Sequence, residues 1–139
     1  MINAISKILS ANDTGETGGH QAGILVPKDP NILGFFPALP SDVKNPRIHL
    51  YFRDDEGCQW EFAFIYYNNR LFGGTRNEYR LTRMTPFING NGLHAGDELI
   101  LERSDGGART IRYRRRHEPA LKDGVLKLGT AWKVVSIEK

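Results

Sequence analysis

The sequence predicts a mainly β fold of about seven short strands and two short helices, closed as a barrel or stacked as a sandwich. Hydrophobic and polar residues alternate with a period of two through most apolar stretches, a pattern typical of half-buried strands. Clusters of glycine, asparagine and aspartate separate these stretches and predict turns. The 139 residues contain no internal repeat or linker, so we expect residues 1–139 to form a single domain.

Both expected helices lie in the first third of the chain. The N-terminus carries apolar residues that would share one face of a short helix, namely Ile2, Ile5, Ile8 and Leu9. A second helical turn is expected within Asn31–Leu39, because Pro30 and Pro40 bound this segment.

Strand candidates occupy most of the remaining chain. The four clearest are Arg47–Arg53, Gln59–Tyr66, Glu98–Glu102 and Thr110–Arg114. Three weaker candidates are Gln21–Val26, Glu78–Met84 and Ala131–Ile137. Asp105-Gly106-Gly107 separates two strand candidates and therefore predicts a hairpin turn.

Charge is distributed unevenly along the chain. Residues 1–65 carry five basic and eight acidic side chains, a net charge of −3, whereas residues 66–139 carry fourteen and eight, a net charge of +6. Twelve of the basic residues are arginine, which is suited to bidentate contacts with phosphate and guanine. This asymmetry indicates an anionic partner for the second half, with a solvated basic face as the alternative. We expect no membrane partner, because no apolar run approaches the ~20 residues of a membrane span.

Motifs for catalysis or metal binding are mostly absent from the sequence. The single cysteine, Cys58, excludes an internal disulfide and makes a structural zinc site improbable. No Gly-x-Ser-x-Gly occurs, and the glycine-rich segment Thr14–His20 lacks the Lys-Ser/Thr that completes a phosphate-binding loop. The only Asp/Glu-x-Lys triplet, Asp42-Val43-Lys44, lies between two prolines and is predicted to be a loop. A metal-dependent nuclease that uses this triplet is therefore only an alternative interpretation.

Two segments have a composition unlike that of ordinary loops, and both are predicted to read DNA. The first combines glycines with varied hydrogen-bonding side chains, and its candidate contacts are Asn12, Asp13, Thr14, Glu16, Thr17, Gly18, Gly19, His20 and Gln21. The second mixes arginines with amides and one acid, and its candidate contacts are Asn68, Asn69, Arg70, Thr75, Arg76, Asn77, Glu78, Tyr79, Arg80 and Arg83. Arginine pairs with guanine, asparagine with adenine, and glutamate accepts from the cytosine amino group. The alternative for Glu78 is an internal salt bridge that organises the loop.

A second basic cluster lies on the last clear strand candidate. Arg112, Arg114 and Arg116 would share one face, because successive side chains on a strand point in opposite directions. With little polar variety beside them, they suit weak attraction to phosphate better than base reading. A solvated outer face of the barrel is an equal alternative.

Both candidate DNA-reading segments resemble the effector domain of the EcoRII restriction endonuclease family. Leu9–Gly15 with Thr17–Gln21 is similar to the start of that domain. Ile65–Asn68, Arg70, Phe72-Gly73, Thr75–Glu78, Arg80 and Thr82-Arg83 are similar to its second signature. Leu93–Leu99 also resembles the plant B-three transcription-factor domain, which shares the fold.

The resemblance implies an open pseudobarrel of seven strands and two short helices, in which an N-arm and a C-arm enter the major groove from two sides. It further implies binding of a CC(A/T)GG site and stimulation of a separate nuclease domain. The first segment, residues 12–21, matches the N-arm, and the second, residues 68–83, matches the C-arm. His20, Arg76, Glu78 and Arg80 are then the strongest candidates for DNA contact.

The chain departs from the family pattern at three positions. Leu25 stands where the family has a tyrosine, and Gly74 and Tyr79 stand where it has lysines, so phosphate-binding charge is lost.

The expected partners are double-stranded DNA and a nuclease domain of the same parent chain, in the bacterial cytoplasm. We expect no cofactor in this domain, with magnesium needed only by the nuclease domain. The alternative to this non-catalytic effector is a transcription-factor-like DNA-binding domain.

Overall fold

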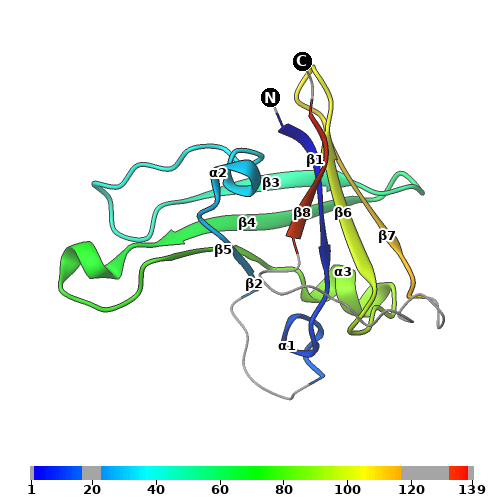
Figure 1. Ribbon diagram of the computed structural model, residues 1–139, viewed down its shortest axis with the longest axis horizontal. Helices are drawn as coiled ribbons and strands as arrows, with labels where there is room; N and C mark the ends of the chain where they lie inside the picture. The colour runs from blue at the N-terminus through cyan, green and yellow to red at the C-terminus, as the bar shows by residue number, and fades with distance from the viewer. Residues whose placement is uncertain (1, 17–22, 117–131, 138–139) are drawn as a thin grey trace.

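The computed structural model describes residues 2–16, 23–116 and 132–137 of the chain. These residues form eight strands, three short α-helices and one 3-10 helix (Figure 1). In chain order they are β1 (Ile2–Ile8), α1 (Ala11–Thr14), β2 (Ile24–Val26), α2 (Pro30–Leu33), β3 (Arg47–Arg53), β4 (Gln59–Tyr67), η1 (Asn69–Phe72), β5 (Glu78–Thr82), α3 (Thr85–Gly90), β6 (Glu98–Arg103), β7 (Arg109–Arg114) and β8 (Trp132–Ile137). None of the helices in these three ranges has the length and apolar character needed to cross a membrane.

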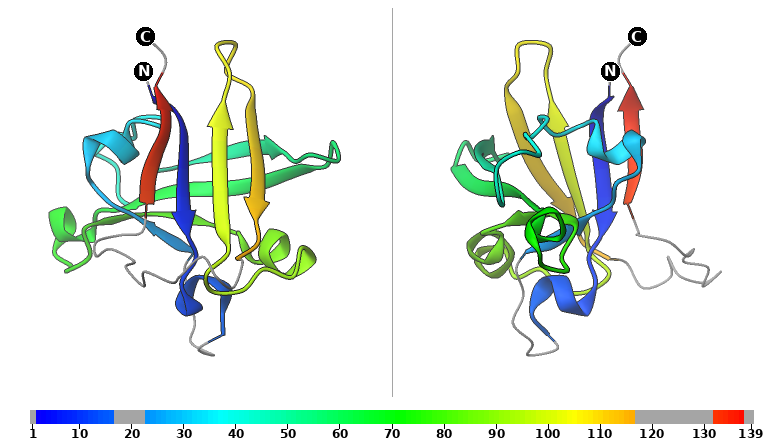
Figure 2. Two further views of the ribbon diagram at one scale, coloured as in Figure 1. Left: turned by 45° about the vertical axis from the view of Figure 1, so that its right-hand side comes forward. Right: turned by 90° about the vertical axis from the view of Figure 1, so that its left-hand side faces the viewer.

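All eight strands belong to one sheet with the order β2-β5-β4-β3-β7-β6-β1-β8. Every pairing is antiparallel except that of β3 with β7, which consists of the single partner pair Arg53 and Thr110. This weak parallel contact joins two antiparallel halves, and Figure 2 shows that the two halves cross at a steep angle. The sheet therefore curls into a half-barrel, which confirms the mainly β, open-barrel prediction.

Phenylalanine side chains fill the inside of the curled sheet. Phe35, Phe52, Phe62, Phe64 and Phe87 are each at most 1% exposed. Each such side chain contributes about 1.5–3 kcal/mol when it is removed from water. This core gives the two predicted DNA-reading segments a rigid base.

The predicted N-terminal helix is wrong, because the segment forms β1 between β6 and β8. Both faces of β1 are covered, so Ala4, Ile5, Ser6 and Lys7 are all buried. A strand buried on both faces lacks the alternation that identifies a half-buried strand, and pairing with two neighbours outweighs the helical spacing of its isoleucines. β1 is also the eighth strand, which corrects the predicted count of seven.

The other predicted elements are present with small shifts in their bounds. All seven expected strands exist, and the Asp105-Gly106-Gly107 turn joins β6 to β7 as a hairpin. The expected helical turn within Asn31–Leu39 is α2, which begins at Pro30 after the N-cap Asp29. The two further helices, α1 and α3, correct the predicted count of two to three.

Candidate nucleic-acid interface

The N-arm and the C-arm leave the sheet at different places. Figure 1 shows α1, where the N-arm starts, below the sheet. The loop that contains η1 is the tip of the C-arm and lies beyond the far end of β4. The C-arm is described throughout, but of the N-arm only residues 12–16 are. The predicted contacts Thr17, Gly18, Gly19, His20 and Gln21 lie outside the described residues, so they stay predictions.

A capping box fixes the root of the N-arm. The Ser10 hydroxyl accepts a hydrogen bond from the Asp13 amide at 3.1 Å, and the Asp13 carboxylate accepts one from the Ser10 amide at 2.9 Å. The Asp13 carboxylate also pairs with Lys7 of β1, and both side chains are 8% exposed. Asp13 therefore anchors the root of the N-arm, and the DNA contact predicted for it stays a prediction.

Glu16 fastens the N-arm to the loop that precedes β6. Its carboxylate accepts hydrogen bonds from the Thr14 hydroxyl at 2.7 Å and from the Ala95 amide at 2.8 Å, and it lies 3.7 Å from His94. The hydrogen bond from Thr14 and then that from Ala95 lower the pKa of Glu16, so it stays ionised. Thr14 and Glu16 thus hold the N-arm in place, whereas the side chain of Asn12 is exposed.

Asn68 organises the C-arm from inside the protein. The Asn68 side chain is fully buried. Its oxygen accepts a hydrogen bond from the Asn45 backbone amide at 2.7 Å. Its NH2 group donates to the carbonyls of Val43 at 2.8 Å and Ser41 at 3.4 Å. These bonds hold the loop that contains the Asp42 triplet. Asn68 thus has a structural role in this structure, and the DNA contact predicted for it stays a prediction.

The C-arm closes into a fixed loop through its backbone. The Arg70 amide donates to the Arg76 carbonyl at 2.9 Å, and the Gly74 amide donates to the Asn69 carbonyl at 2.7 Å.

Asn77 and Tyr79 support the base of this loop. The Asn77 side chain accepts from the Tyr66 hydroxyl at 2.8 Å, and the Tyr79 ring stacks on Tyr66 with a centroid separation of 4.2 Å. The predicted contacts Arg70, Thr75 and Arg83 are exposed, and Asn69 is half-buried.

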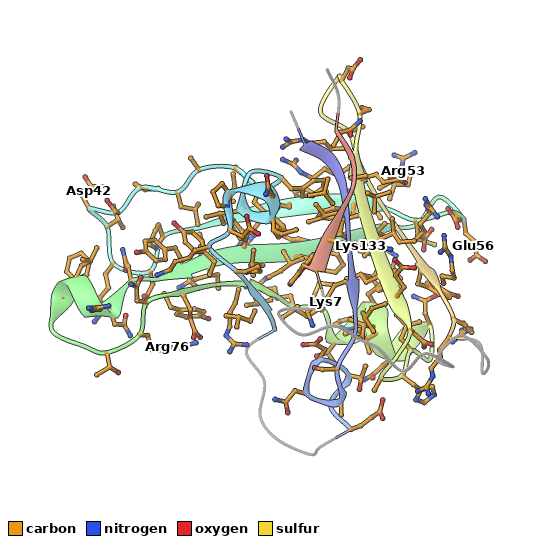
Figure 3. The ribbon with its side chains drawn as sticks, viewed as in Figure 1. Lys7, Asp42, Arg53, Glu56, Arg76 and Lys133 are labelled. Carbon is orange, nitrogen blue, oxygen red and sulfur yellow. The ribbon has the colours of Figure 1, made fainter. Side chains whose placement is uncertain are left out.

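Three charged side chains form a row at the base of the C-arm, which we call the arginine–glutamate row: Arg76, Glu78 and Arg80. One oxygen of Glu78 accepts from both arginines at 2.7 Å, and the three side chains are 40%, 30% and 21% exposed. The Arg76 guanidinium also lies 3.9 Å from the centroid of the Tyr67 ring. The salt bridge expected as the alternative for Glu78 therefore exists, and it holds two arginines side by side (Figure 3 labels Arg76).

Ionisation of Glu78 is favoured within this row. Partial burial raises its pKa, but the hydrogen bonds and charges of the two arginines outweigh burial, so the pKa lies below its ordinary value. The row consequently carries a net charge of +1 at neutral pH. It offers guanidinium donors and a carboxylate acceptor on one surface.

Gly23, which follows the N-arm in the chain, contacts a strand of the C-arm, and sequence reasoning missed it. Gly23 has a φ of +83°, and a Cβ added there would lie 2.2 Å from the Leu81 carbonyl oxygen. Its own carbonyl accepts a hydrogen bond from Arg80 at 3.1 Å. A lone glycine at the start of a strand signals close backbone approach, and this was the available clue. The backbone at Gly23, just before β2, is thereby held against the strand that carries Glu78 and Arg80.

The second basic cluster is paired with acids of the neighbouring strand. Arg112 lies 3.2 Å from Glu102 and Arg114 lies 3.3 Å from Glu98, while the Arg116 amide donates to Asp97 at 2.9 Å. The hydrogen bond with Glu102 raises the pKa of Arg112. The Arg116 contact is made by its backbone amide and leaves its side-chain charge in place, so phosphate attraction stays a prediction beside the solvated-face alternative.

The Asp42 triplet lies in a loop at one end of the molecule, as predicted (Figure 3). Across residues 2–16, 23–116 and 132–137, no group of three histidine, cysteine, aspartate or glutamate side chains is arranged to hold a metal ion. The nuclease alternative therefore gains no support from the part of the chain that the structure covers.

Known proteins resemble this chain in sequence and in fold. The family model described as "Restriction endonuclease EcoRII, N-terminal" matches residues 2–112. The type II restriction enzyme EcoRII of Escherichia coli is 44% identical over 80 residues, which cover 55% of this chain and 20% of the enzyme. Auxin response factor 12 of Arabidopsis thaliana is 30% identical over 120 residues, covering 85% of this chain and 18% of that protein.

A solved Arabidopsis FUS3–DNA complex has a similar fold, with a TM-score of 0.63 and 23% identity over 81% of this chain and 96% of that one. This likeness confirms the pseudobarrel fold. The chain spans only 20% of the length of the Escherichia coli enzyme. The match over residues 2–112 covers most of the chain, and the chain therefore belongs to the family of EcoRII restriction endonuclease N-terminal domains.

Proposed function

We propose that this chain binds double-stranded DNA sequence-specifically, with its N-arm and C-arm in the major groove. It acts as the non-catalytic effector domain of a restriction endonuclease whose nuclease domain lies in the same parent chain. The proposed site is CC(A/T)GG or a close variant. Family membership supports the class, and the relatives include an enzyme and plant factors that carry such a domain.

The arginine–glutamate row is the observation that carries the proposal. An arginine donates two hydrogen bonds to the O6 and N7 atoms of guanine, and a carboxylate accepts one from the N4 amino group of cytosine. Glu78 and Arg80 are two residues apart on β5, so their Cα atoms are about 6.6–6.8 Å apart. That distance is close to two base-pair steps of about 3.4 Å each. The row therefore suits a site rich in G·C pairs.

The salt bridges do not conflict with base reading. Before DNA binds, Glu78 keeps both guanidinium groups in fixed positions, which lowers the entropy lost when they contact a base. The side chains remain between one fifth and two fifths exposed, so their free edges are accessible to a partner. A row that only gripped phosphate would gain nothing from a carboxylate at its centre.

A competition binding experiment tests the proposal. Labelled CC(A/T)GG duplex is bound by the 139-residue chain at moderate salt and displaced by unlabelled duplexes of the same or scrambled sequence. We expect the matched duplex to compete at least about 30-fold better, because two base-reading contacts of about 1–3 kcal/mol each give at least about 2 kcal/mol together. Equal competition by both duplexes would refute sequence-specific binding.

Arg80→Met and Arg114→Met are matched variants, since each removes one arginine charge from a strand. Arg80→Met should remove discrimination between the duplexes, whereas Arg114→Met should leave it intact. Stimulation of the parent enzyme's cleavage by added site-containing DNA then tests the effector role. A transcription-factor-like domain would bind the site and produce no such stimulation.

A further inference from the structure

A pocket of about 460 Å³ opens between the last residues of β3 and the first residues of β7. Its polar lining includes Arg53, Gln59, Arg109 and Thr110. Figure 3 places Arg53 at the opposite end of the molecule from Arg76 of the arginine–glutamate row. A duplex held by the two arms does not explain this pocket.

The strand register concentrates positive charge beside the pocket. Arg109 lies directly opposite Arg103 in the β6–β7 ladder, and Arg53 is paired with Thr110, the neighbour of Arg109. Like charges directly opposite each other destabilise a sheet. Burial and then the Arg103 charge lower the pKa of Arg109. The fold therefore retains an arrangement that is unfavourable on its own.

The Nε atoms of both opposed arginines are buried without a hydrogen-bond acceptor among the described residues, but Arg103 has other partners. Arg103 donates to the carbonyls of Phe35 at 2.6 Å and Gly34 at 3.3 Å. The Nε of Arg109 is buried and has no hydrogen-bond partner among the residues that the structure describes. A buried donor without a partner is unfavourable, so an acceptor that reached it would stabilise the protein.

The acids nearest in the sheet are engaged elsewhere. Glu102 pairs with Arg112 at 3.2 Å, and Asp54 accepts from the Trp60 ring nitrogen at 3.0 Å and from two backbone amides. The pocket has no acidic side chain among its described lining residues. It thus combines two arginines with neutral hydrogen-bonding groups and lacks a counter-charge of its own.

We propose that this pocket is an oxyanion site that takes a phosphate group. A phosphate offers several acceptor oxygens, enough for the guanidinium groups of Arg53 and Arg109 and for the neutral amide of Gln59. Its negative charge offsets the repulsion between Arg103 and Arg109. The same chemistry is available from inorganic phosphate and from a DNA backbone beyond the arms, and the site is independent of how the arms read bases.

Thermal melting of the 139-residue chain tests the site. The melting temperature is compared in sodium phosphate and in sodium chloride of equal ionic strength. We expect phosphate to raise the melting temperature of the wild type and to have no added effect on Arg109→Met. In chloride, Arg109→Met should melt no lower than the wild type, since the repulsion is gone. Arg47→Met, on the same β3 strand but outside the pocket, is the control and should respond to phosphate like the wild type.

An equal rise in the wild type and in Arg109→Met would overturn the proposal, because it would show a general effect of phosphate on the folded state. Should Arg109→Met fail to fold, Arg53→Met provides the same comparison. The Nε–H signals of Arg53 and Arg109 in NMR spectra identify the source of the bound phosphate group. If the signals shift when duplex is added beyond the amount that saturates the two arms, the phosphate belongs to a DNA backbone. If they shift only with inorganic phosphate, the ligand is a free anion. No shift with either ligand refutes the site.

Discussion

Replacing Glu78 with glutamine isolates the acid at the centre of the arginine–glutamate row. Glutamine keeps the size of the side chain but removes the charge that accepts from Arg76 and Arg80 at 2.7 Å. Because the three side chains are 21–40% exposed, solvent screens the two salt bridges. We expect a stability loss of only about 1 kcal/mol, the upper range for exposed ion pairs.

The effect of Glu78→Gln on DNA recognition should be larger than its effect on stability. The acceptor for cytosine N4 is weakened, and a glutamine side chain instead favours adenine, so preference at that base pair should fall by about 1–3 kcal/mol, or roughly 5- to 150-fold. The net charge of the row rises from +1 to +2. Binding to unrelated DNA should therefore tighten, and the salt dependence should steepen by at most about 0.9 in the log–log slope.

Fluorescence anisotropy between about 50 and 200 mM salt measures both effects, with the matched duplex and a duplex altered at one base pair. Glu102→Gln is the control, because it removes one acid from the Arg112 pair of the β6–β7 face with the same change in net charge. The control should shift affinity without changing preference. An unchanged preference in Glu78→Gln, or an equal loss in Glu102→Gln, would refute base reading by Glu78.

Four further perturbations test the contacts that hold the two arms and the arginine–glutamate row. Gly23→Ala should lower both the melting temperature and DNA affinity, because its φ of +83° costs about 1–2 kcal/mol for alanine and the new Cβ meets a backbone oxygen at 2.2 Å. Asn68→Ala should lower the free energy of unfolding, measured in urea, by about 1–3 kcal/mol for the buried groups left unpaired, with base preference unchanged. Lys7→Met should cost about 3–5 kcal/mol by leaving the buried Asp13 carboxylate without its counter-charge, and Lys7→Met with Asp13→Leu should recover part of this in the same assay. Because the folded-state pKa of Glu78 is lowered, its contribution is present above the unfolded value of about 4.3 and lost as the pH falls, so the melting temperatures of wild type and Glu78→Gln should converge as the pH falls below that lowered pKa.

The sequence predicted the fold where its pattern is local. Strands with one buried face, such as β3 and β4, are visible as alternation, and the β6–β7 turn is visible as a glycine pair. β1 was missed because Ser6 and Lys7 are buried together with their apolar neighbours, which removes the alternation. α1 was missed because only four residues are helical, although Ser10 and Asp13 have the spacing of a capping box.

The candidate site was predicted in composition but not in geometry. Arg76, Glu78 and Arg80 were expected as DNA contacts because of their residue types and the family resemblance, and the structure joins them through one carboxylate oxygen. The buried roles of Asp13 and Asn68 depend on partners elsewhere in the chain, Lys7 and the loop around Val43. Local residue type contains no information about such distant partners, so both residues looked like surface contacts.

Removal of a single guanine N7 atom tests the central claim most directly. Each guanine of the CC(A/T)GG duplex is replaced in turn by 7-deazaguanine, and affinity is measured for the wild type and for Arg80→Met in a double-mutant cycle. The proposed contact predicts one position where the replacement weakens the wild type by roughly 10-fold, about 1.4 kcal/mol, and has no effect on Arg80→Met. Equal losses in both proteins at every guanine, or no loss at any, would contradict base reading by the C-arm.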